Sequence, residues 1–159
     1  MPKIKLDKID AQLLKAIQKN GRITNSELAA KVSLSPSPCL RRVRTLEDSG
    51  VIKRYVGILD PKLIGISING FVSVRLKNQG RAALKEFEDT IKTYSAVMEC
   101  YLMTGTSDYL LRVSVQDLEH YEKFLIDKIT TIPCVGNIES SFSLKQVLYR
   151  TELPIISDE

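Results

Sequence analysis

Histidine, cysteine and reactive motifs are scarce in this chain of 159 residues. His120 is the only histidine, and the three cysteines, Cys39, Cys100 and Cys134, lie far apart in the sequence. They form neither a zinc-type cluster nor a disulfide framework, and we expect free, buried thiols in a reducing cytosol. A glycine-rich phosphate loop and a nucleophile with an evident base are also absent. These absences argue against an enzyme and against a metal sensor.

Long apolar runs are absent as well. No stretch approaches the 18 apolar residues that indicate a membrane-spanning helix. The N-terminal sequence MPKIKLDKID has no apolar run of the signal-peptide kind. We therefore expect a cytoplasmic protein without a membrane partner. The hydrophobic fraction of 43% is enough for a core, and the length fits two small domains.

Positive charge is concentrated in the N-terminal third. Residues 1–54 hold 12 Lys/Arg and 5 Asp/Glu, a balance of +7. Residues 55–159 hold 11 Lys/Arg and 14 Asp/Glu, a balance of −3. This asymmetry indicates a polyanion-binding module joined to a part that does not bind nucleic acid.

The stretch Thr24–Gly50 predicts two short helices joined by a tight turn. Thr24 and Glu27 have the spacing of a capping box at the start of the first helix. Ser33-Leu34 breaks that helix, Ser35 is suited to cap the second one, and Gly50 is suited to end it as a left-handed cap. A basic helix after a capped helix and a tight turn is the pattern of a helix–turn–helix DNA-binding motif.

Opposite faces of the second helix have different expected roles. Its periodicity places Leu40, Val43 and Glu47 inward, with Leu46 at the edge. The arginines Arg41 and Arg44 lie on the opposite, outward side, where they suit bidentate contact with guanine. Arg42 lies at the border and is better placed for a phosphate than for a base. The candidate DNA-binding residues are Thr24, Asn25, Ser35, Ser37, Pro38, Arg41, Arg42, Arg44 and Thr45.

The rest of the first 70 residues completes an N-terminal domain. Apolar residues at helical spacing predict a first helix over Lys5–Asn20, and β-branched residues predict a wing-like or linking strand over Val51–Leu59. Lys53 and Arg54 make the start of that strand basic, so that it could touch the DNA backbone. We expect residues 1–60 to form the DNA-binding domain with its linking strand and residues 61–70 to form a linker.

Residues 71–159 predict a second domain of strands and helices. Strands are expected over 71–77, 96–104, 108–115 and 135–144, and helices over 81–94 and 117–132; residues 147 and 148 could extend the last strand. This order is the split βαβ, ferredoxin-like arrangement, so the fold class is α+β. One sheet face would stay open, with Phe71 and Leu110 among polar residues, and the simplest cover is a second copy in a two-fold dimer.

Four motifs connect the chain to a known family: LDKID (Leu6–Asp10), GRITNSELA (Gly21–Ala29), LSPSPCLRRVRTLEDSGVI (Leu34–Ile52) and GTSDYLL (Gly105–Leu111). On these motifs the chain resembles the leucine-responsive regulatory protein/AsnC (Lrp/AsnC) family of transcription regulators over about residues 6 to 150. The resemblance implies a winged helix–turn–helix, a linking strand and a ferredoxin-like amino-acid-sensing domain. It also implies duplex DNA as a partner, dimers that often assemble into octamers, and control of amino-acid metabolism or transport genes at the nucleoid. The sequence leaves the choice between dimer and octamer open.

The resemblance also implies an effector site between dimers, around the hairpin Gly105–Asp108, and no other cofactor. Backbone N–H groups in such a turn suit a carboxylate, and the Asp108 side chain suits an ammonium group. Ser141 and Ser143 stand where leucine-responsive members often have larger apolar residues, so the identity of the effector stays open. The candidate effector-binding residues are Leu102, Gly105, Thr106, Ser107, Asp108, Leu118, Ser141, Phe142 and Ser143.

A second hypothesis stays open beside the sensor. An architectural protein that wraps DNA without an effector would have the same basic first domain, and its binding would fall steeply with salt on any sequence. RNA binding through the sheet is disfavoured, since Phe71 alone does not make the exposed aromatic platform that such binding uses.

Overall fold

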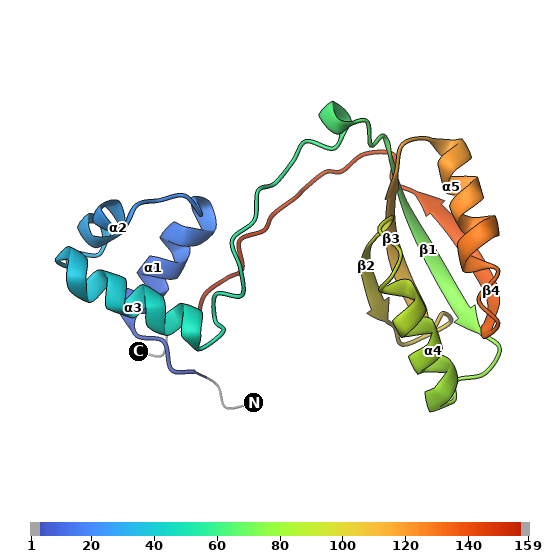
Figure 1. Cartoon of the computed structure of the whole chain (residues 1–159), viewed down its shortest axis with the longest axis horizontal. Coiled ribbons are helices and arrows are strands. Elements are labelled where there is room, and N and C mark those ends of the chain that lie inside the picture. Colours follow the sequence, from blue (N-terminus) through green and yellow to red (C-terminus); the bar gives the residue numbers. More distant parts are fainter. Residues whose placement is uncertain (1–3, 157–159) are drawn as a thin grey trace. The chain divides into compact units, whose positions relative to one another are not determined.

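The computed structural model of the chain describes residues 4–156 and divides into two compact units (Figure 1). Unit 1 contains the chain up to Ile58 together with the C-terminal segment from Val147, and unit 2 spans Leu59–Gln146. The C-terminal segment from Val147 thus packs with the helices of unit 1, although it follows the elements of unit 2 in the sequence. In the described part of the chain, no helix is long and apolar enough to cross a membrane.

Unit 1 is built on three helices, α1 (Lys8–Lys19), α2 (Asn25–Lys31) and α3 (Pro36–Asp48). Both α1 and α2 begin with a capping box, formed in α2 by Thr24 and Glu27 as predicted. Leu13, Leu28 and Val43, one from each helix, are buried in a shared core. Three short helices therefore bury one core and hold α3 at the surface.

The strand predicted over Val51–Leu59 is wrong. The first strand among the described residues begins at Ile68, and residues 53–60 run extended without regular structure (Figure 1). Their β-branched side chains favour an extended backbone, but a strand also needs a hydrogen-bonding neighbour, and among residues 4–156 none pairs with this segment. The predicted extension of the last strand to residues 147 and 148 is wrong for the same reason, because that strand ends at Phe142.

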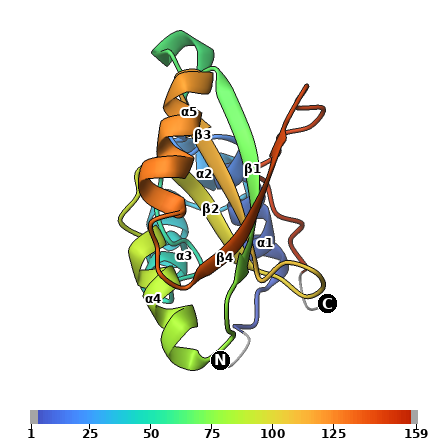
Figure 2. The same ribbon diagram turned by 90° about the vertical axis from the view of Figure 1, so that its right-hand side faces the viewer.

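Unit 2 has the predicted ferredoxin-like order. Its elements are β1 (Ile68–Leu76), α4 (Arg81–Ile91), β2 (Val97–Leu102), β3 (Tyr109–Val115), α5 (Leu118–Phe124) with the π-helical turn η2 (Leu125–Ile129), and β4 (Val135–Phe142). The antiparallel sheet has the order β2-β3-β1-β4, and α4 and α5 cover one of its faces (Figure 2). A short 3-10 turn over Lys62–Ile64 precedes β1.

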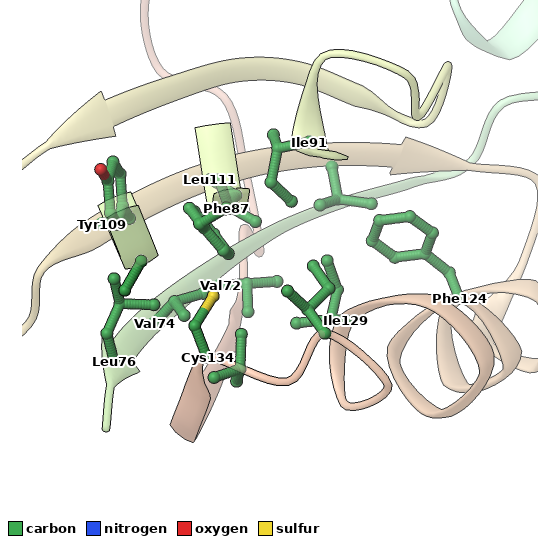
Figure 3. Packing of buried hydrophobic residues seen from close by; sticks show 14 of the residues in the cluster. Val72, Val74, Leu76, Phe87, Ile91, Tyr109, Leu111, Phe124, Ile129 and Cys134 are labelled. Atoms are coloured by element: carbon green, nitrogen blue, oxygen red, sulfur yellow. The ribbon is translucent and has the colours of Figure 1, made fainter. Parts of the chain in front are cut away.

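The core of unit 2 lies between the helices and the sheet (Figure 3). Val72 and Val74 alternate inward on β1, and the rings of Phe87 and Tyr109 pack with their centroids 4.5 Å apart. Gly70 lies in the sheet beneath the Tyr121 ring of α5, so close that a Cβ atom there would stand 2.7 Å from the ring. A glycine at this position therefore allows α5 to sit tightly on the sheet.

Within the residues described for unit 2, no helix covers the opposite face of the sheet, as predicted. Phe71 pairs with Arg112 across β1 and β3, so their side chains lie together on this open face. Arg112 also forms a 2.7 Å ion pair with Glu99 of β2, and its guanidinium holds the pKa of that carboxyl below the usual range. Apolar Phe71 and Leu110 thus stand among paired charges on a surface that a second copy could cover.

The expectation that all three thiols are buried is partly wrong. Cys39 and Cys134 are buried, but Cys100 is exposed. Cys100 lies on β2, which is an edge strand of the sheet. The sequence pattern of a strand does not show whether the strand lies at the edge of its sheet, so the exposure of Cys100 could not be predicted from it.

Candidate DNA-binding and effector sites

The buried side of α3 differs from the predicted one by about one residue position. Cys39, Val43 and Leu46 are buried, whereas Leu40 is 38% exposed and Glu47 is exposed. Buried cysteine behaves as a small apolar residue, so Cys39 belongs to the apolar stripe that the periodicity assigned to Leu40. Glu47 instead accepts a 2.8 Å hydrogen bond from the Tyr55 hydroxyl, and burial together with this carboxylate raises the pKa of Tyr55 to about 12.

The outward side of α3 carries the predicted polar residues. Ser37, Arg41, Arg44 and Thr45 are all exposed. Thr45 donates its hydroxyl hydrogen to the Arg41 carbonyl at 3.0 Å, so this threonine is engaged with its own helix. Among residues 4–156, no acidic side chain forms an ion pair with Arg41 or Arg44. Two arginines three positions apart therefore present free guanidinium groups on one side of the helix.

Arg42 is placed differently from the predicted phosphate contact. Its Nη1 atom lies 2.7 Å from Asp7 Oδ2 and 2.8 Å from Asp10 Oδ1. Asp7 and Asp10 form the capping box of α1, so Arg42 ties α3 to the start of α1. The Asp10 backbone N–H and the Arg42 guanidinium both hold the pKa of the Asp7 carboxyl below its usual range. The structure thus gives this arginine an internal partner.

Thr24 and Asn25 also make internal contacts. The Thr24 hydroxyl donates to Glu27 Oε2 at 2.8 Å, and Asn25 Nδ2 donates to the Pro36 carbonyl at 2.9 Å. Asn25 therefore joins the start of α2 to the start of α3, while its own Oδ1 is buried without a partner among the described residues. Both side chains help to shape the motif from which α3 projects.

Ser35 and Pro38 lie at the start of α3. Ser35 occupies the N-cap position, but its side chain makes no capping hydrogen bond. Its exposed hydroxyl stands next to the first-turn N–H groups, an arrangement that suits a phosphate oxygen. Pro38 is half-buried in the first turn, where its missing N–H costs no helical hydrogen bond.

A left-handed residue makes the turn between α2 and α3. Ser33 has φ +55°, and Leu34 N–H donates to the Ala29 carbonyl at 2.9 Å. Together with the longer Ser33-to-Ala30 bond, this is the Schellman arrangement that ends many helices, usually with glycine at the left-handed position. The helix break was predicted, but a serine in this conformation was not. At the other end of α3, Gly50 has the predicted left-handed φ of +75°.

In the Gly105–Asp108 hairpin, Asp108 fastens the turn to the sheet. Asp108 Oδ2 accepts a 2.7 Å hydrogen bond from the Leu76 backbone N–H, and Oδ1 accepts one of 2.7 Å from Gln79 Nε2. The expected role for this carboxylate was pairing with an ammonium group, but both of its oxygens already have partners in the chain. Gly105 has φ +114°, a conformation that other residues rarely adopt.

The candidate effector residues form two groups in one chain. Leu102, Gly105, Thr106, Ser107 and Asp108 form the hairpin group, at the β3 end that begins with Tyr109. The second, the β4-end group, contains Leu118, Ser141, Phe142 and Ser143. Ser141 pairs with Phe71, and Leu118 follows the Val115 end of β3. Phe71 also pairs with Arg112, three positions along β3 from Tyr109, and β4 lies two strands away from β3, which corresponds to about 10 Å along the strands and about 10 Å across them.

Two aromatic rings are in contact at the β4-end group. Phe142 is 45% exposed, and its ring meets that of Tyr121 edge-on with centroids 4.8 Å apart. The Tyr121 hydroxyl donates to the Ser140 hydroxyl at 3.0 Å. Leu118, at the start of α5, is 59% exposed. Sequence reasoning missed Tyr121 and Ser140, and helical spacing marked Tyr121 only as a core residue.

His120 lies outside both groups. It is exposed on α5, where its Nδ1 atom is 2.8 Å from Asp117 Oδ1. Asp117 caps α5 by accepting from the His120 backbone N–H. The lone histidine thus supports a helix start.

Comparison with known proteins covers nearly the whole chain. Residues 6–53 match the family model of a winged helix-turn-helix DNA-binding domain, and residues 69–153 match that of the Lrp/AsnC ligand binding domain. The Bkd operon transcriptional regulator of Pseudomonas aeruginosa is 43% identical, over 94% of this chain and 98% of the relative. The leucine-responsive regulatory protein of Escherichia coli is 35% identical, over 94% of this chain and 92% of the relative.

A solved structure agrees in fold. The crystal structure of a transcriptional regulator from Neisseria meningitidis in complex with L-Met superimposes with a TM-score of 0.90 and 36% identity. The match covers 94% of this chain and 97% of the other. These relatives are named as transcriptional regulators rather than as enzymes.

Proposed function

The chain belongs to the Lrp/AsnC family of transcriptional regulators, and from that premise we propose how it reads DNA and what controls it. It binds specific duplex sites through the outward side of α3, and an amino acid bound between copies of unit 2 changes that binding. Its targets are genes of amino-acid metabolism, and it acts in the cytoplasm at the nucleoid.

The observation that carries the DNA-binding proposal is the pair of free guanidinium groups on α3. Arg41 and Arg44 are exposed and have no acidic partner in the described part of the chain. A helix–turn–helix inserts its second helix into the major groove, where arginine is the side chain best suited to guanine. Ser35 and Ser37, at the N-terminal end of α3, suit the flanking phosphates.

Arg42 has a different role in this proposal. The arginine is held by two carboxylates, so a phosphate contact would have to break or share that arrangement. We therefore assign base reading to Arg41 and Arg44 and assign Arg42 to the support of the motif.

The separation of the two effector groups supports a site made by more than one copy. The hairpin group lies at the turn between β2 and β3, whereas β4 is the edge strand on the other side of the sheet, so one chain alone does not surround a small ligand with both groups. Two-fold pairing through the open face, followed by assembly of such dimers, would supply the missing group from another copy. An octamer built from four dimers is the assembly that we propose.

An amino acid with an aliphatic side chain is the effector class that we propose. One relative is named for its response to leucine, and another was crystallised with L-Met. In this chain the exposed apolar side chains of Leu102, Leu118 and Phe142 suit an aliphatic group. The N–H groups of the glycine turn suit its carboxylate.

The experiment begins by selecting bound fragments of genomic DNA and measuring binding of the preferred duplex by fluorescence anisotropy. Arg41→Ala and Arg44→Ala should each weaken binding by about 1–3 kcal/mol, or roughly 5- to 150-fold. Arg81→Ala, which removes an exposed arginine from α4, is the matched control and should leave affinity unchanged. Preserved affinity in both α3 variants would reject the assignment of α3 as the reading helix.

The effector is sought by repeating the measurement with each of the twenty amino acids at millimolar concentration. A change in affinity with one aliphatic amino acid supports the sensor. The alternative, an architectural DNA binder, predicts no response and a steep loss of affinity with salt on every duplex, without preference for the selected one.

A further inference from the structure

The C-terminal tail, Leu144–Ile156, fastens to the DNA-binding unit at a defined point. Leu153 N–H donates to Gln18 Oε1 at 2.7 Å, and Gln18 Nε2 donates to the Leu153 carbonyl at 3.1 Å. One side chain of α1 thus satisfies both backbone groups of a tail residue, as a neighbouring strand would. Figure 1 shows the tail, in red, returning to the helices of unit 1.

Next to this pair of hydrogen bonds, an apolar side chain enters the domain core. Ile155 is half-buried and packs against the cluster that contains Leu14 and Ile17 of α1. The two contacts lie two residues apart in the tail, so hydrogen bonding and apolar packing act at one place.

The rest of the tail is free of such contacts. Leu144, Val147 and Leu148 are largely exposed, and within residues 4–156 the tail makes no hydrogen bond other than those of Leu153. The last sheet-side bond before it runs from Ser143 N–H to the Asn69 carbonyl. The segment is therefore held at its two ends only.

The tail also borders an apolar pocket of unit 1 that is half open to solvent. A cavity of about 520 Å³ lies among α1, the extended segment after α3 and the tail, lined by apolar residues that include Ile17, Val51, Tyr55 and Ile155. Ile155 is the tail residue that packs against the core, and most of its neighbours in the tail are exposed, so the tail loses few apolar contacts when it lifts. This arrangement suits a contact that opens and closes.

We propose that Gln18 is a positioning residue that latches the tail onto the DNA-binding unit and so makes a second, releasable connection between the two units. The first connection is the chain itself after Ile58. Because β4 ends at Phe142 and Ser143 leads directly into the tail, occupation of the β4-end group would act on the tail directly. This coupling rests on the proposed effector site. When Gln18 holds the tail, the two helix–turn–helix motifs of a dimer can bind two DNA half-sites together. When the tail is released, the effective concentration of the second motif at its half-site falls.

Amide hydrogen exchange on the full-length chain tests the latch itself. Loss of two hydrogen bonds in Gln18→Ala should speed exchange at Leu153 at least about fivefold, with little change in α3. Gln12→Ala, an exposed position on the same helix, is the matched control and should change nothing. Ile155→Ser should also release the tail, because it removes the apolar side chain that packs against the core of unit 1. Leu148→Ser, at an exposed tail position, is its control. Equal tail exchange in Gln18→Ala and Gln12→Ala would overturn the proposal.

DNA binding tests what the latch does. On the selected duplex with two half-sites, Gln18→Ala and Ile155→Ser should bind several-fold more weakly, whereas on a single half-site they should match the unmodified protein. With L-methionine and L-leucine as probes, any effect on the unmodified protein should shrink in both variants. If amide exchange shows that the tail is released in these variants but their affinity for the duplex with two half-sites is unchanged, the latch has no role in DNA binding. If neither probe affects the unmodified protein, the aliphatic-effector part of the proposed function fails, while the exchange and half-site results still decide the latch.

Discussion

Replacing Arg42 by methionine separates an arginine that supports the motif from one that reads DNA. The change keeps most of the apolar stem and removes the guanidinium that joins Asp7 and Asp10 to α3. The side chains of Arg42 and Asp7 are 35% and 51% exposed, so solvent screens their pair, whereas Asp10 is only 17% exposed. Exposed pairs contribute about 0.2–1 kcal/mol, and hydrogen bonds to charged groups about 1.5–3 kcal/mol.

After that discount, we expect Arg42→Met to lower the opening free energy of unit 1 by about 1–2 kcal/mol. Native-state hydrogen exchange of the α1 and α3 amides measures this quantity without requiring the two units to unfold together. Arg41→Met, which removes a guanidinium without an acidic partner in residues 4–156, should stay within about 0.5 kcal/mol of the unmodified protein. DNA affinity should show the reverse order, with the larger loss in Arg41→Met.

The pH dependence has a definite sign. The pKa of Asp7 in the folded state lies below the ordinary value of 3.8, so the ionised form stabilises the folded state above that pH. This contribution is lost as pH falls through the folded pKa, and the difference between Arg42→Met and the unmodified protein should shrink in the same range. Unchanged α1 exchange in Arg42→Met, together with a loss of DNA affinity as large as that of Arg41→Met, would refute the supporting role.

Three further changes test local geometry. Ser33→Gly relieves a left-handed serine and should raise the opening free energy of α2 by about 0.5–1 kcal/mol, measured by hydrogen exchange; no gain would contradict the Schellman turn. Gly70→Ala places a Cβ 2.7 Å from the Tyr121 ring and should lower the urea midpoint of unit 2 by an amount equivalent to about 1–3 kcal/mol, with partial recovery when Tyr121→Leu is added. Asp108→Asn weakens a charge-assisted bond and should speed exchange of the Leu76 amide roughly tenfold, whereas an unaltered rate would show that the bond is not formed.

Local signals were the ones that sequence reasoning read correctly. The capping box of Thr24 and Glu27 depends on residues three apart, and the left-handed cap at Gly50 depends on one residue. The alternation of Val72 and Val74 in β1 likewise needs only the period of a strand. These features predicted the helix–turn–helix and the order of elements in unit 2 because each is decided by neighbours along the chain.

Features that depend on distant residues were missed. Arg42 finds its acidic partners 35 and 32 positions away, and no helical period can show that. Gln18 and Leu153 are 135 positions apart, so no local pattern could show that the tail bonds to α1. The inward side of α3 was predicted wrongly for another reason. Cys39 was not counted as apolar, and the remaining apolar residues fit two helix orientations that differ by one residue position.

The position of Asp108 affects how an effector experiment must be read. Its carboxylate holds the hairpin through Leu76 and Gln79, so removing it would disturb the turn whether or not a ligand touches Asp108. Loss of a ligand response in Asp108→Ala would therefore not place the ligand. Thr106 is exposed and makes no hydrogen bond among the described residues, so Thr106→Ala leaves the turn intact while changing what it presents to another copy. A response that is lost in Asp108→Ala but kept in Thr106→Ala and Leu118→Ala would point to the shape of the hairpin, whereas loss in all three would favour direct contact from both groups.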